Sequence, residues 1–177
     1  MFDFIENEEA KAKLEQSADR IQRAYAELLG GYALRAEDVL NETVRVESYN
    51  GLVDVQDITF YTFCEHHFLP FFGTASVVYK PRHIITGLGK VLRLVRDVHA
   101  RRLQIQETMA RDICHDIVRV LDAHGARVTL RAKHLCMCSR GPSDDNAVTE
   151  VVYTYGDLSV IQTPLESTPQ TSRNSGA

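Results

Sequence analysis

Two pairs of strand-like segments enclose two amphipathic helices in this 177-residue chain. The four segments rich in β-branched and aromatic side chains cover residues 52–63, 74–79, 127–132 and 148–155. Between the pairs, helices are predicted over residues 90–101 and 105–123, and the second repeats apolar residues every four positions from Ile105 to Leu121. This order of elements, ββααββ, predicts an α+β fold in which an antiparallel sheet carries helices on one face.

Two helices can cover only one face of a four-stranded sheet, so the other face and both edges must meet water or another chain. Assembly of several copies into a closed sheet would satisfy them. An additional helix is predicted from Asn7 to about Leu29, where Gly30 and Gly31 end it. Its apolar side is narrow, comprising Leu14, Ile21 and Leu28, and we expect a neighbouring subunit to bury it.

The length and the 44% hydrophobic content fit one globular domain with appendages. We expect an N-terminal helical segment over residues 1–50, the main domain over 51–160 and a disordered polar tail over 161–177. The net charge of -4 and the lack of basic runs argue against a nucleic-acid partner. The acidic first residues and the absence of a long apolar stretch predict a cytoplasmic protein that does not enter a membrane.

Two clusters of cysteine and histidine predict a metal site. In the segment CEHH, Cys64 and His67 are three positions apart, a spacing that lets one turn present both side chains to one zinc ion. Cys136, in a second loop that also bounds a strand, would be the third ligand. Three protein ligands leave a position open for water, as in catalytic zinc sites, whereas a structural site would be closed by a fourth ligand, here Cys138.

Two further histidines flank these ligands and are candidates for proton transfer. His66 precedes a ligand directly, and His134 lies two residues before another. The remaining histidines lack such neighbours, and we expect them on the surface or on a helix face: His83, His99, His115 and His124.

Two other segments could bind a nucleotide. Gly87 and Gly89 lead into a helix on which Lys90 and Arg93 share a face and could bind phosphate oxygens, although charged residues on a helix more often simply face solvent. The carboxylate of Glu107, after Gln106, could accept two parallel hydrogen bonds from the edge of guanine, and an ordinary solvent-facing glutamate would look the same.

Taken together, FYTFCEHHFLPFFG, TGLGKVLRLV, RRLQIQE and KHLCMCSRG resemble the GTP cyclohydrolase I family, from about Ser17 to Gly156. The resemblance implies the tunnelling fold, in which subunits of the ββααββ type join their sheets into a barrel, usually as a homodecamer. It also implies the family reaction, which converts GTP and water to 7,8-dihydroneopterin triphosphate and formate.

The resemblance further implies a role for each matching residue. Zinc would be held by Cys64, His67 and Cys136, and activated water would add at C8 of the purine. His66 would protonate the imidazole nitrogen as that ring opens, and His134 would assist opening of the ribose. Gln106 and Glu107 would bind the guanine edge, and the triphosphate would be held by Lys90, Arg93, Arg140 and Arg20.

Several departures from the family pattern leave alternatives open. The SKxxR phosphate motif begins here with Gly89, which removes a hydroxyl donor, the TPxR motif around Arg20 reads SADR, and the segment after Gly156 is short. A specialised paralogue that acts on a related purine nucleotide, or stops at a ring-opened intermediate, is therefore a second hypothesis. A non-catalytic assembly stabilised by zinc, with Cys138 closing the site, is a third. A nitrile reductase of the same fold is not favoured, because the pairing of CEHH with HxC indicates a metal rather than a lone nucleophilic cysteine.

Overall fold

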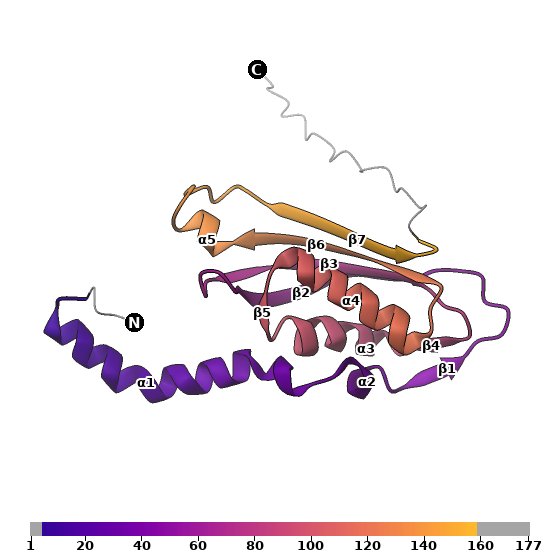
Figure 1. Ribbon diagram of the computed structural model, residues 1–177, viewed down its shortest axis with the longest axis horizontal. Helices are drawn as coiled ribbons and strands as arrows, with labels where there is room; N and C mark the ends of the chain where they lie inside the picture. Colours follow the sequence, from indigo (N-terminus) through magenta and orange to yellow (C-terminus); the bar gives the residue numbers. More distant parts are fainter. Residues whose placement is uncertain (1–4, 159–177) are drawn as a thin grey trace, which may run out of the picture.

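The computed structural model describes residues 5–158 and has a five-stranded sheet at its centre, in the order β5-β2-β3-β6-β7 (Figure 1). The strands are β2 (Val53–Cys64), β3 (Pro70–Lys80), β5 (Leu103–Gln104), β6 (Gly125–His134) and β7 (Thr149–Gly156). All pairings are antiparallel except that of the short β5 with the end of β2. The four predicted strands are confirmed, although β3 begins at Pro70 rather than Thr74, and β5 was not predicted.

The three predicted helical regions are present in the predicted order, together with three short helices in the described part of the chain that were not predicted. They are α1 (Glu8–Leu28), η1 (Gly30–Ala33), α2 (Ala36–Val39), α3 (Leu88–Arg93), η2 (Leu94–His99), α4 (Gln106–Leu121) and α5 (Leu135–Cys138). The side chain of Asn7 caps α1 by accepting a hydrogen bond from the backbone N–H of Ala10 at 2.9 Å. One helix was predicted over residues 90–101; instead, α3 continues into the π-helical turns of η2.

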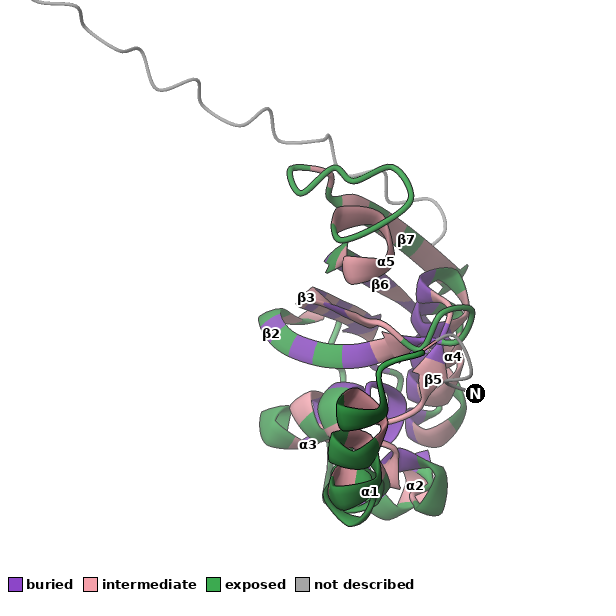
Figure 2. Ribbon diagram, turned by 90° about the vertical axis from the view of Figure 1, so that its left-hand side faces the viewer, coloured by how far each residue is buried: buried purple, intermediate pink, exposed green. Residues whose placement is uncertain are grey.

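Helices α3, η2 and α4 pack on one face of the sheet, as predicted (Figure 2). Alternate residues of β6 are buried from Ala126 to Ala132, which places one face of the strand in the core. The apolar stripe of α4 is fully buried from Met109 to Leu121, and it packs against β6 and β7. On the opposite face, Tyr61 is 71% exposed. The sheet is curled, and its mixed α/β architecture is consistent with the tunnelling fold.

One edge of the sheet is β7. The other edge is β2, except at its last two residues, which pair with β5. Within residues 5–158, neither of these edges has a further partner strand. The sequence predicted two such edges. A separate two-stranded sheet pairs β1 (Thr43–Arg45) with β4 (Ile84–Thr86). It was not predicted, because the sequence from Ala33 to Asn50 shows no clear periodicity.

Helix α1 extends away from the rest of the domain (Figure 1), and none of its residues is buried. Its contact with the sheet is made through Tyr25, whose ring centroid lies 5.4 Å from that of Phe63 and 5.9 Å from that of Phe68. The tail predicted over residues 161–177 lies outside the described residues. None of the helices in the described part of the chain has the length and apolar character needed to cross a membrane.

His99 was expected at the surface or on a helix face. It does lie on a helix, but the surface alternative was wrong, because its side chain is only 2% exposed. It lies in η2, and its Nε2 is 3.0 Å from Oδ2 of Asp116 in α4. Burial alone would raise the pKa of Asp116, but hydrogen bonds from His99 and Arg119 outweigh that effect and lower it. The pair joins η2 to α4 inside the domain.

Candidate metal centre and active site

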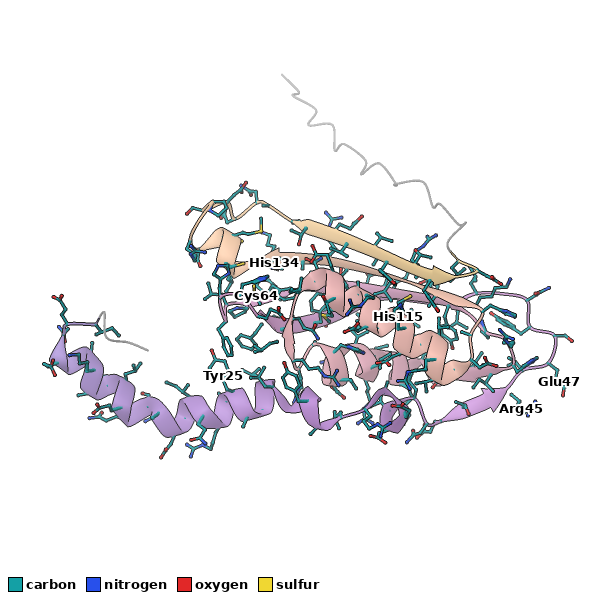
Figure 3. All side chains as sticks on the ribbon, in the orientation of Figure 1. Tyr25, Arg45, Glu47, Cys64, His115 and His134 are labelled. Atoms are coloured by element: carbon teal, nitrogen blue, oxygen red, sulfur yellow. The ribbon has the colours of Figure 1, made fainter. Side chains whose placement is uncertain are left out.

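Three loops or strand ends converge at one end of the sheet. Cys64 is the last residue of β2, His67 lies in the turn that leads to β3, and Cys136 lies in α5, directly after β6. Strand β3 joins these parts, because Phe71 pairs with Thr62 on one side and with His134 on the other. In Figure 3, Cys64 and His134 are labelled at this end, with Tyr25 of α1 below them.

The ligand atoms of Cys64, His67 and Cys136 all lie within 4.8 Å of one another. Sγ of Cys64 is 3.9 Å from Nδ1 of His67. A tetrahedral zinc site with usual bond lengths separates its ligand atoms by about 3.6–3.8 Å, so the three groups need to approach by about 1 Å at most. Two thiols and an imidazole are a donor set that suits zinc. The residues present therefore fit this metal.

Cys138 does not belong to this group of potential ligands, which is the only such group in the described part of the chain. It follows Cys136 by two positions within the short helix α5, and residues two apart on a helix do not face each other. The arrangement therefore favours three protein ligands over a closed site with four.

The two thiols influence each other. Burial raises the pKa of Cys136, and the proximity of Cys64 raises it further. A cation bound between the two sulfur atoms would reverse this effect, because it stabilises thiolates. His66 is exposed, and its Nδ1 lies 3.7 Å from Sγ of Cys64, so it can reach both this site and solvent.

His134 is held firmly at the end of β6. Its ring stacks on Phe71 with the centroids 4.3 Å apart and the planes inclined by 6°. Its Nε2 lies 2.7 Å from Oε1 of Gln106, at the start of α4. Burial lowers the pKa of His134, and the nearby carboxylate of Glu107 offsets only part of that shift. The imidazole is therefore favoured in its neutral form.

Arg140 and Glu107 complete the polar surroundings. Nη1 of Arg140 lies 3.2 Å from Nε2 of His67, so the guanidinium is close to the metal ligands. Gly141 follows with a φ of 62°, a left-handed conformation that suits glycine and turns the chain after Arg140. Glu107 is exposed in the first turn of α4, whereas its neighbour Gln106 is buried.

The other predicted phosphate ligands lie elsewhere in the chain. Lys90 and Arg93 are on α3, toward the end of the domain that carries β1 and β4 (Figure 1). Nζ of Lys90 is 2.9 Å from Oε1 of Glu42, and Nε of Arg93 is 3.1 Å from Oδ2 of Asp97. Arg20 is exposed on α1. One chain therefore brings together the metal ligands, His66, His134, Gln106, Glu107 and Arg140, but not the remaining cations.

The sequence did not indicate three residues that shape this site. Phe71 stacks on His134, and Tyr25 anchors α1 beside the metal loop. The hydroxyl of Thr149, at the start of β7, reaches the side chain of Gln106 in α4. Phe71 lies within the segment that carries the first metal cluster, so its position was a usable signal. The contact of Thr149 depends on how β6 pairs with β7, and no local pattern predicts it.

Comparison with known proteins matches this chain to one family. The sequence profile of GTP cyclohydrolase I matches residues 1–166. The chain is 43% identical to GTP cyclohydrolase 1 of Allorhizobium ampelinum over 140 residues, which are 78% of this chain and 69% of the relative. It is 42% identical to GTP cyclohydrolase 1 of Campylobacter jejuni over 134 residues, or 76% of this chain and 70% of the relative. The apo crystal structure of the archaeosine synthase QueF-Like aligns with 62% of this chain and 97% of its own, with a TM-score of 0.49 and 18% identity.

Proposed function

This chain belongs to the GTP cyclohydrolase I family, and on that premise we propose that it opens the imidazole ring of GTP by hydrolysis, releases formate and forms 7,8-dihydroneopterin triphosphate. The observation that carries the proposal is the convergence of Cys64 and His67 with Cys136, which lies far from them in the sequence, beside two histidines. A ring-opening hydrolase requires an activated water and groups that transfer protons, and this end of the sheet offers residues suited to both.

In this proposal, the Sγ atoms of Cys64 and Cys136 and a ring nitrogen of His67 hold a zinc ion. Zinc bound there would lower the pKa of water and so make a nucleophile available at neutral pH for attack at C8 of the purine. The exposed His66 would supply a proton to the imidazole nitrogen as the ring opens. His134 would assist the later opening of the ribose, and its stacking on Phe71 keeps the imidazole in a fixed plane.

Substrate binding is assigned by charge and exposure. The carboxylate of Glu107 is exposed beside His134 and is suited to the guanine edge, to which the family pattern also assigns Gln106. The triphosphate would be held by Arg140 near the metal together with Lys90, Arg93 and Arg20. Because the last three lie apart from the metal ligands within one chain, we propose that neighbouring subunits supply them.

Such an arrangement requires an oligomer, and we propose a homodecamer in which sheets join edge to edge. The outer strands β2 and β7 supply two edges that hydrogen-bond to each other in neighbouring subunits. The narrow apolar side of α1, which no part of the described chain buries, would pack on another copy. A monomeric mass in solution would rule out this assembly and the shared phosphate site with it.

The test of the activity is product analysis. Zinc-loaded protein incubated with GTP should release formate and form a product that becomes fluorescent on oxidation. A His134→Ala variant should still open the purine ring but accumulate an intermediate that precedes rearrangement of the sugar. Protein that binds zinc yet forms neither formate nor pterin would show that the proposed activity is wrong.

A second candidate function is ring opening of a related purine nucleotide, or ring opening that stops before the pterin forms. Gly89 favours it, because the phosphate motif lacks the hydroxyl of the family pattern. A panel of purine nucleotides analysed by mass spectrometry distinguishes the two candidates. A formamidopyrimidine without neopterin, or faster turnover of another nucleotide, would favour the second.

A further inference from the structure

The side chain of Gln106 is fully engaged inside the protein. It is 3% exposed, and its Nε2 donates to the backbone oxygen of Leu130 at 2.9 Å and to that of Thr149 at 3.4 Å. Its Oε1 is 2.6 Å from the hydroxyl of Thr149 and 2.7 Å from Nε2 of His134. An amide has two N–H donors and one oxygen that accepts about two hydrogen bonds, so all of its capacity is used.

These partners determine which way the amide points. Backbone oxygens can only accept hydrogen bonds, so the amide nitrogen must face Leu130 and Thr149. The amide oxygen then faces the Thr149 hydroxyl and His134. Because that oxygen is an acceptor, it requires Nε2 of His134 to carry a hydrogen.

The tautomer of His134 follows from this arrangement. A neutral imidazole carries one N–H, so a hydrogen on Nε2 leaves the lone pair on Nδ1. The stacked ring of Phe71 restricts rotation of the imidazole out of its plane. The nitrogen available to exchange a proton with a bound molecule is therefore Nδ1.

We propose that Gln106 and Thr149 are positioning residues that fix the tautomer and orientation of His134, and that the Gln106 side chain does not bind guanine. Thr149 of β7 holds the amide of Gln106 in α4, and the amide holds the imidazole at the end of β6. Recognition of the guanine edge is then left to the exposed Glu107. The catalytic consequence rests on the proposed function, whereas the tautomer is a property of the folded protein and does not depend on it.

The tautomer is measured on the wild-type protein, and a variant is used only to identify the signals of His134. Zinc-loaded full-length protein labelled with ¹⁵N-histidine is examined by magic-angle-spinning NMR at a pH where the imidazole is neutral. The signals of His134 are identified by their loss in His134→Ala. The expected result is a protonated Nε2 and an unprotonated Nδ1. A proton on Nδ1 instead would overturn the proposal, whether or not the protein turns over GTP.

The positioning role is tested by kinetics and product analysis of Gln106→Met, which keeps the length of the side chain but removes its polar atoms. A positioned acid–base group contributes about 10²- to 10⁴-fold, so loss of orientation alone should lower kcat at least about tenfold. The KM for GTP should stay within about twofold, and ring-opened nucleotide should accumulate relative to pterin. A rise in KM without accumulation would mean that Gln106 contacts the substrate, and a parallel loss of both products would mean a merely structural role. Either result overturns the proposal.

Thr149 offers a milder test and a matched control. Thr149→Val has the same shape but no hydroxyl, and it should raise the ratio of ring-opened nucleotide to pterin. Thr149→Ser keeps the hydroxyl, and its ratio should equal that of the wild type. Equal ratios in the Val and Ser variants would overturn the part assigned to Thr149. If the wild type forms neither product, the proposed function fails, while the NMR result still decides the tautomer.

Discussion

The substitution Gly89→Ser would restore the hydroxyl that the phosphate motif of this chain lacks. A Cβ atom built at Gly89 has no heavy atom within 4 Å, so a serine fits without displacing a neighbour. The residue is exposed in the first turn of α3 and directly precedes Lys90, whose ammonium is paired with Glu42 at 2.9 Å. The added hydroxyl would therefore lie beside a cation that is proposed to bind the triphosphate.

The expected gain follows from the strength of one hydrogen bond to a charged group, which is about 1.5–3 kcal/mol. The lower value applies here because the position is exposed. Since about 1.4 kcal/mol corresponds to a factor of ten, the KM for GTP should fall about tenfold. The hydroxyl would bind phosphates far from the reacting carbon, so it should stabilise ground state and transition state equally and leave kcat unchanged.

The assay measures formation of the fluorescent oxidised product over a range of GTP concentrations. Gly89→Ala is the matched control, because it adds the same Cβ atom and raises the helix propensity of α3, by up to about 1 kcal/mol, without a hydroxyl. Guanosine, which has no phosphates, should show no gain with either variant. If the Ser and Ala variants have the same KM for GTP, the hydroxyl does not contact phosphate and the reasoning is refuted.

Three further predictions concern the metal, the core and the response to acid. Cys138→Ser should retain zinc and turnover, whereas Cys64→Ser should lose most of the bound zinc, as measured by atomic absorption after gel filtration; the reverse result would indicate a site that uses Cys138. Ile117→Ala removes a fully buried side chain and should lower the free energy of unfolding by about 2–5 kcal/mol in urea denaturation, and a loss below 1 kcal/mol would contradict its place in the core. The pKa of Asp116 is lower in the folded protein, so its contribution to stability is present above the unfolded pKa of about 3.9 and is lost as pH falls through the folded pKa. In Asp116→Asn the fall in the free energy of unfolding between about pH 5 and pH 3 should therefore be smaller than in the wild type, and an identical fall would exclude this role.

Much of the fold was predictable because the decisive patterns are local. Enrichment in β-branched and aromatic residues identifies a strand such as β2, and the four-residue spacing of apolar residues from Met109 to Leu121 identifies α4. The metal ligands were predictable for a chemical reason, since closely spaced cysteine and histidine side chains form a donor set that suits zinc. Both inferences depend on residue type and spacing along the chain, which the sequence states directly.

The tertiary structure alone decided which polar side chains are buried and what they contact. Nothing in the sequence distinguishes His99, which is buried against Asp116, from the histidines that were expected at the surface. Likewise, Gln106 and Glu107 are neighbours in the sequence, yet one is enclosed by β6 and β7 and the other faces solvent. Burial and hydrogen-bond partners depend on the register of strands and on how helices pack against them, and these are set by contacts between residues far apart in the chain. The sequence therefore determined the elements and the ligand types, while the packing of α4 against the sheet decided how His134 is held.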